Sequence, residues 1–122
     1  MEKHKRKKAF MICPVRNDPA GELSKKYVED LERQGWDVHW PHRDTYQRDS
    51  AYEICLTNLN AIRRANRVFV VWDGESQGVL FDLGVAFAEL KPITWLKLPE
   101  RTIGKSFENM VRAWEDRAWE EW

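Results

Sequence analysis

The chain has 122 residues, and 20 lysines and arginines balance 20 aspartates and glutamates, so its formal net charge at pH 7 is zero. This length suits a single domain, and the balanced overall charge gives no reason to expect nucleic acid, whose phosphates favour a basic face. Because no segment approaches the roughly 18 consecutive apolar residues of a membrane span, we expect no membrane partner and no specific nucleic-acid partner.

The first eight residues, MEKHKRKK, are strongly basic, and we predict that residues 1–8 form a flexible terminus. Residues 9–122 are predicted to form one domain, in which short apolar runs alternate with segments of helical period. The expected strands are 9–13, 36–40, 67–72 and 92–98, and the expected helices are 22–34, 50–65, 79–90 and 107–122. This order predicts a three-layer α/β fold, flavodoxin-like or Rossmann-like, in which helices cover both faces of a parallel sheet of four to five strands.

Three segments carry more specific expectations. Gly35 follows the first helical pattern and is a natural helix terminator. The polar stretch PHRDTYQRDS, residues 41–50, is long for a loop and is predicted to be a lid over a binding site. Trp114 and Trp122 lie near the end of the chain, where we expect them to contact another copy in a homodimer or higher homo-oligomer.

Ligands of open parallel sheets bind beyond the carboxyl ends of the strands, where the winding direction reverses. This rule places the site at residues 14–17, which follow the first strand, and at residues 73–78, which follow the third. The first segment supplies Arg16, and the second supplies Ser76, Gly78 and the amino terminus of a helix, a combination that suits an anion. Asp82 follows within an apolar run, where a buried carboxylate is costly unless it is paired or hydrogen-bonded, so its presence there suggests a functional role.

Several familiar chemistries are excluded. The turn DGESQG has neither the lysine of a P-loop nor the glycine spacing of a dinucleotide fingerprint. His39, His42 and Asp44 are too weak a pattern for a metal site, and we expect no metal and no cofactor. Cys13 and Cys55 are too few for a disulfide framework, which favours a reducing, cytoplasmic location.

The stretch ANRVFVVWDGESQGVLFDLGVAFAELKPI, residues 65–93, resembles the corresponding part of the nucleoside 2-deoxyribosyltransferase family, which includes the 2'-deoxynucleoside 5'-monophosphate N-glycosidases. Gly78, Val79, Leu83, Gly84 and Ala86 match the family's pattern, and Asp82 occupies the position of its catalytic glutamate. The opening FMICPVRND, which includes Pro14, also resembles the family's first strand and substrate-binding turn. The resemblance covers about residues 9–97.

The resemblance implies a carboxylate nucleophile that attacks the sugar of a nucleoside or nucleotide and forms a covalent ester. Asp82 would be that nucleophile, and its place near a helix amino terminus suggests that it stays ionised. Ser76 matches the serine that binds phosphate in the monophosphate N-glycosidases, Arg16 is placed to bind the same group, and Asp73 belongs to the same substrate-binding turn.

Three positions depart from the family's pattern. Asp82 is one methylene shorter than glutamate, Asn58 replaces a second acid that assists the leaving base, and Phe10 replaces a tyrosine that helps to position the nucleophile. Asparagine can orient a base but cannot protonate it. Two alternatives to an N-glycosidase or deoxyribosyltransferase therefore stay open: a nucleotide-binding module with weakened catalysis, and an assembly protein that binds through its tryptophan-rich end.

Overall fold

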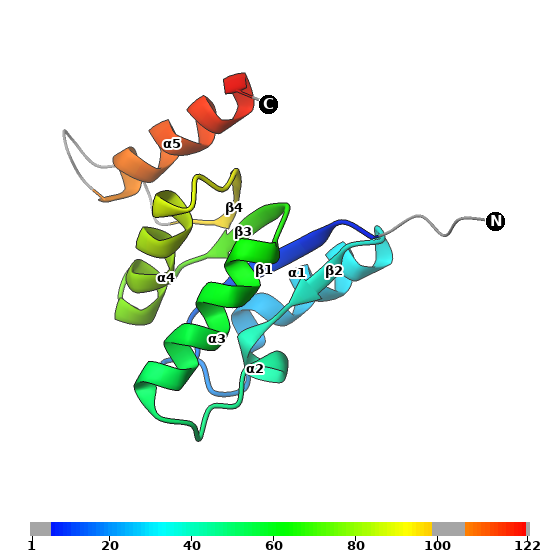
Figure 1. Cartoon of the computed structure of the whole chain (residues 1–122), viewed down its shortest axis with the longest axis vertical. Coiled ribbons are helices and arrows are strands. Elements are labelled where there is room, and N and C mark those ends of the chain that lie inside the picture. Colours follow the sequence, from blue (N-terminus) through cyan, green and yellow to red (C-terminus); the bar gives the residue numbers. More distant parts are fainter. Residues whose placement is uncertain (1–5, 99–106, 122) are drawn as a thin grey trace.

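A computed structural model describes residues 6–98 and 107–121 of the chain (Figure 1). Its four strands form one parallel sheet in the order β2-β1-β3-β4, which confirms the predicted α/β fold. The elements are β1 Lys8–Ile12, α1 Glu22–Arg33, β2 Asp37–His39, α2 Pro41–Asp44, α3 Ala51–Arg64, β3 Arg67–Val71, α4 Gln77–Ala88, β4 Ile93–Lys97 and α5 Phe107–Glu121. None of the helices in this described part is long and apolar enough to cross a membrane.

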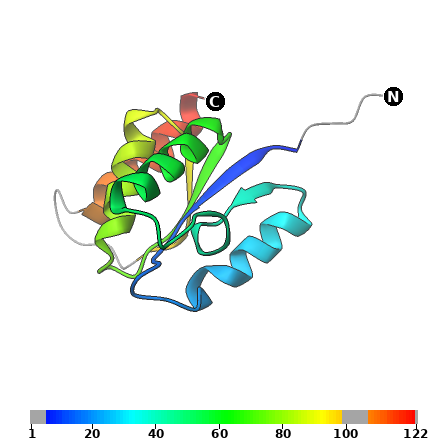
Figure 2. The same ribbon diagram turned by 60° about the horizontal axis from the view of Figure 1, so that its bottom comes forward.

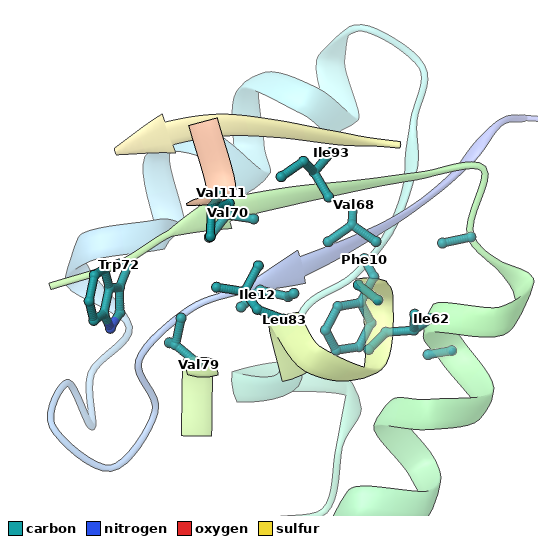
Figure 3. Packing of buried hydrophobic residues seen from close by; sticks show 13 residues of the cluster. Phe10, Ile12, Ile62, Val68, Val70, Trp72, Val79, Leu83, Ile93 and Val111 are labelled. Atoms are coloured by element: carbon teal, nitrogen blue, oxygen red, sulfur yellow. The ribbon is translucent and has the colours of Figure 1, made fainter. Parts of the chain in front are cut away.

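The sheet is the middle of three layers, with α1 against one face and α3, α4 and α5 against the other (Figure 2). Successive residues of a strand point to opposite faces, and β1 divides its side chains accordingly. Ala9 and Met11 pack with Val28 of α1, whereas Phe10 and Ile12 pack into the cluster on the other face. Figure 3 shows this second cluster, to which α3, α4 and α5 contribute Ile62, Leu83 and Val111, among others.

Local signals in the sequence define the helix ends on either side of β2. After α1, Gly35 has a positive φ of 99°, and its amide donates to the Glu32 carbonyl while the Trp36 amide donates to Leu31. This pair of bonds is the Schellman arrangement that glycine favours, and it confirms Gly35 as the terminator. At the start of α3, the Ser50 hydroxyl accepts a hydrogen bond from the Glu53 amide.

The segment 41–50 differs from the predicted polar loop because its first four residues form the short helix α2. Proline at the first helical position favours such a start, and Pro41 occupies it here. The segment is also tied down: the Trp40 indole donates to the Ser24 hydroxyl at 2.9 Å, and Arg43 donates to the Val38 carbonyl at 2.9 Å. In this structure the beginning of the expected lid is a fixed wall attached to α1 and β2.

Two further boundaries differ from the sequence prediction. The helix expected at 79–90 runs from Gln77 to Ala88: Ser76 just before it has an extended backbone, and Leu90 adopts a left-handed φ of 56° just after its end. The terminus predicted to be flexible overlaps β1, which already begins at Lys8. Residues 1–5 and Trp122 lie outside the described residues.

Candidate active site

A pocket of about 940 Å³ opens beyond the carboxyl ends of β1 and β3. Its walls come from residues 13–17 after β1, from Pro41 and Gln47, from the first half of α3, and from residues 75–82 at the start of α4. Because β1 and β3 are neighbours whose following helices cover opposite faces, this is the reversal point of the sheet. Six of the eight predicted site residues line the pocket: Pro14, Arg16, Asn58, Ser76, Gly78 and Asp82.

Asp82 lies in the second turn of α4, partly exposed to the pocket. Burial raises the pKa of its carboxyl group to about 7, and the hydrogen bond from Asn58 opposes this rise. The sequence suggests an ionised Asp82 supported by the helix amino terminus. The structure corrects this expectation, because the field of a helix end acts mainly within its first turn and Asp82 is the sixth helical residue.

Asn58 reaches Asp82 from the neighbouring helix α3. Its Nδ2 atom donates to the Asp82 Oδ2 atom at 3.4 Å, and its Oδ1 atom accepts a 2.8 Å hydrogen bond from the Thr45 hydroxyl. Among the described residues, Asn58 is the one hydrogen-bond donor to the Asp82 carboxylate. Thr45 is 4% exposed and was not among the site residues predicted from the sequence. Its one signal in the sequence is its place in the polar segment 41–50.

Asp73 does not line the pocket, although we expected it to bind substrate. Its Oδ1 atom accepts hydrogen bonds from the amides of Glu75 and Ser76, and its Oδ2 atom accepts from the Ser76 hydroxyl at 2.9 Å. Although desolvation opposes them, these bonds lower the pKa of Asp73. The carboxylate therefore holds the turn that leads into α4 and does not face the pocket.

The start of α4 is suited to an anion. Ser76 makes no side-chain cap, so the main-chain amides of the first turn, at Gln77, Gly78 and Val79, have no side chain to accept their hydrogen bonds. A Cβ atom on Gly78 would meet open space, which leaves room for a ligand to approach the backbone. The Ser76 hydroxyl already donates to Asp73 and accepts from Asn17 Nδ2 at 3.2 Å, so Asn17 also belongs to this end of the pocket.

Arg16 lies at the rim of the pocket, where its side chain is exposed. It makes no ion pair with any of the described residues, so its guanidinium group is available to an anion bound at the start of α4. Pro14 is fully buried beside it, and the Pro14 carbonyl accepts a 2.9 Å hydrogen bond from His42 Nε2.

Phe10 is not part of the pocket surface. It is 0% exposed, belongs to the core, and stacks on the His39 ring with a centroid separation of 5.3 Å. The resemblance aligns Phe10 with the family's tyrosine, and on that ground we expected it among the substrate-binding residues. Every interior residue of β1 is buried between the helical layers, however, and Phe10 does not line the pocket. A direct substrate contact by Phe10 has no support in this geometry.

The histidines considered as metal ligands are engaged in other bonds. His39 Nε2 bonds the Thr45 hydroxyl, His42 Nε2 bonds the Pro14 carbonyl, and Asp44 pairs with Arg43. Cys13 lies close enough to Asp82 to interact with it electrostatically, and burial raises the pKa of its thiol to about 12, so it stays protonated. The polar side chains that line the pocket include Arg16 and Ser76 at the anion site, the pair of Asp82 and Asn58, and also Gln47 and Glu75.

Comparisons with known proteins agree with this arrangement. Residues 13–113 match the family model of the nucleoside 2-deoxyribosyltransferases. The CMP N-glycosidase BcmB of Clostridium botulinum superposes with a TM-score of 0.64 at 17% identity, over 90% of this chain and 82% of that one. A 2-deoxyribosyltransferase of Leishmania mexicana superposes with a TM-score of 0.61 at 22% identity, over 78% of this chain and 67% of that one. No curated protein sequence matches the chain.

At these identities the two superpositions show a shared fold, while the family model covers more than half of the chain, including both segments that line the pocket after β1 and β3. The chain therefore belongs to the nucleoside 2-deoxyribosyltransferase family.

Proposed function

We propose that the pocket cleaves the N-glycosidic bond of a deoxynucleoside 5'-monophosphate, with Asp82 as the nucleophile. The observation that carries the proposal is the placement of Asp82 and Asn58 inside one pocket with the uncapped start of α4 and the unpaired Arg16. In this proposal, the phosphate lies at the start of α4, near Arg16, and the sugar lies over Asp82.

The reaction has two steps. The ionised carboxylate of Asp82 attacks the anomeric carbon, and the bond from that carbon to the base breaks with its electron pair passing to the base nitrogen. Asn58 has no acidic proton to give, so the departing base takes a proton from water. Water, or the nitrogen of another base, then attacks the same carbon and releases the Asp82 carboxylate. Water as the acceptor makes the protein a hydrolase, and a second base makes it a transferase.

The test is an assay of deoxynucleosides and their 5'-monophosphates for free base by chromatography. We expect the monophosphates to react, and Asp82→Asn to reduce the rate by at least about 100-fold. Because attack needs the ionised carboxylate, the wild-type rate should fall as the pH drops below about 7. Asp49→Asn is the matched control, since Asp49 is exposed and does not line the pocket. Base release that survives Asp82→Asn would exclude Asp82 as the nucleophile.

A second candidate is a nucleotide-binding module without efficient turnover. Asn58 supports this candidate, because an amide stands there in place of the family's proton donor. In that case a deoxynucleoside monophosphate raises the melting temperature of the protein but yields no free base.

The alternative of an assembly protein is weaker, because Trp114 packs within the chain. It is partly buried against Phe87, with 5.3 Å between the ring centroids. Trp122 and the Trp119 side chain lie outside the described residues.

We also propose that the chain forms a homo-oligomer. Trp114, which we expected to make the contact between copies, packs against Phe87 within the chain, so we place the contact on α4 instead. Helix α4 carries one charged residue, Asp82, and presents Phe81 and Phe87 outward with 58% and 60% of their surface exposed. A helix that is apolar on all sides is normally covered. Because Phe81 also lines the pocket, a second copy on this face would complete the wall beside Asp82.

A further inference from the structure

Behind Asp82 and Asn58, a chain of hydrogen bonds continues to two residues that do not line the pocket. The Thr45 hydroxyl donates to Asn58 Oδ1 at 2.8 Å, and the same oxygen lies 2.8 Å from His39 Nε2. The four side chains come from β2, from the segment after α2, from α3 and from α4. The hydrogen bonds therefore join the pocket to His39 at the carboxyl end of β2.

The direction of these bonds decides what Asn58 offers to Asp82. A threonine hydroxyl has one hydrogen, and here that hydrogen goes to Asn58 Oδ1. The Thr45 oxygen must then accept the hydrogen of His39 Nε2, and the Asn58 Nδ2 group is left to face the Asp82 carboxylate. If the His39 hydrogen were on Nδ1, Thr45 would donate to His39 instead. Asn58 would then turn its oxygen toward Asp82, which disfavours the ionised carboxylate.

The surroundings keep the His39 ring neutral and restrain its orientation. Burial lowers the pKa of His39, so the ring is neutral at pH 7 and carries one hydrogen. Phe10 stacks on this ring with planes 13° apart, which restrains its orientation. The charged groups that act on His39 are Asp44, Arg64, Arg43 and Asp37, and Cys13 is a titratable group that interacts with Asp82.

We propose that Thr45 and His39 are positioning residues: they hold the Asn58 amide with its Nδ2 group toward Asp82 and so favour the ionised, nucleophilic carboxylate. This inference rests on the proposed function for its catalytic meaning, but the hydrogen-bond direction is a property of the resting protein. It also gives Phe10 a role, since Phe10 acts on the pocket through His39 and not by touching substrate.

The test follows the Asp82 carboxyl carbon by NMR titration in the absence of substrate, with Asp82→Asn to assign the signal. Thr45→Val keeps the shape of the side chain but removes the hydroxyl, and we expect it to raise the Asp82 pKa by about half a unit or more, since the amide is no longer held as a donor. Thr45→Ser restores the hydroxyl and should return the pKa to the wild-type value. Thr57→Val is the matched control: it makes the same change on α3, one residue before Asn58 and outside the pocket.

An unchanged Asp82 pKa in folded Thr45→Val overturns the proposal. A second measurement needs no variant and decides the matter if Thr45→Val does not fold: nitrogen NMR of the His39 ring in the wild-type protein. We expect hydrogen on Nε2 and a bare Nδ1 near pH 7, and the opposite tautomer refutes the proposed direction. Neither measurement depends on turnover, so a failure here is distinct from a failure to release base from any deoxynucleotide.

Discussion

Asp82 is a carboxyl group that the fold makes more costly to ionise. Its pKa is about 7 in the folded protein, whereas the ordinary value is 3.8. A raised folded pKa means that the group stabilises the native state most at low pH and that this contribution is lost as the pH rises from about 4 through 7. The proposed reaction needs the ionised form, so Asp82 would lower the stability of the protein at the pH at which we propose that it reacts.

Replacing Asp82 by asparagine should therefore change stability in a pH-dependent way. The unfolding free energy of Asp82→Asn minus that of wild type should be larger at pH 8 than at pH 4, by on the order of 2–4 kcal/mol. Urea unfolding at both pH values measures this difference, and Asp49→Asn provides the exposed control. An equal wild-type-to-variant difference at pH 4 and pH 8 would show that Asp82 titrates normally.

The sequence identified the pocket residues well where their position followed from the ends of strands. Arg16, Ser76 and Gly78 were found in this way. Asp82 was found because a carboxylate in an apolar run is costly and therefore conspicuous. Phe10 was placed at the site by its alignment with the family's tyrosine, whereas the structure buries it in the core behind the pocket. Thr45 and His39 were missed because their bonds link segments whose meeting depends on tertiary packing.

At the scale of the elements, the connections around α1 depend on two glycines with positive φ. Gly21 precedes α1, and a Cβ atom there would lie 2.7 Å from Cζ2 of the Trp40 ring, whereas a Cβ on Gly35 would meet nothing within 4 Å. Alanine at Gly35 should cost about 1–2 kcal/mol from backbone strain alone. Alanine at Gly21 should cost about 1–3 kcal/mol more, because it also displaces Trp40 from its bond to Ser24.

Urea unfolding of the two alanine variants separates strain from collision. Equal losses at both positions would show that Trp40 moves aside freely and that α2 is less firmly attached than its hydrogen bonds indicate.

Helix α2 is the element that the sequence did not predict. Four residues are too few for a period to be recognised, and the helix is held by distant partners such as the Val38 carbonyl. The longer helices were predicted because burial of one face leaves a repeating pattern, and the buried strands because they form short continuous apolar runs.

For the whole molecule, the outward apolar face of α4 predicts a stable assembly of identical chains. Light scattering at micromolar concentration should give at least a dimer, and Phe81→Glu should shift it toward monomer while reducing any base release. Leu90→Glu is the control, because Leu90 is 80% exposed but lies at the opposite end of the sheet from the pocket. A wild-type monomer under these conditions would contradict the prediction.

The pocket draws its two ends from different kinds of structure. Asp82 and Asn58 belong to long helices packed into the core, whereas Arg16 and Ser76 belong to the short connections that follow β1 and β3. If the proposed function holds, the connections could be exchanged in an engineered chain, to suit another substituent on the sugar, while the carboxylate and amide beneath them are kept. Over evolutionary time, the same division would let substrate preference diverge while the proposed reacting centre stayed in place.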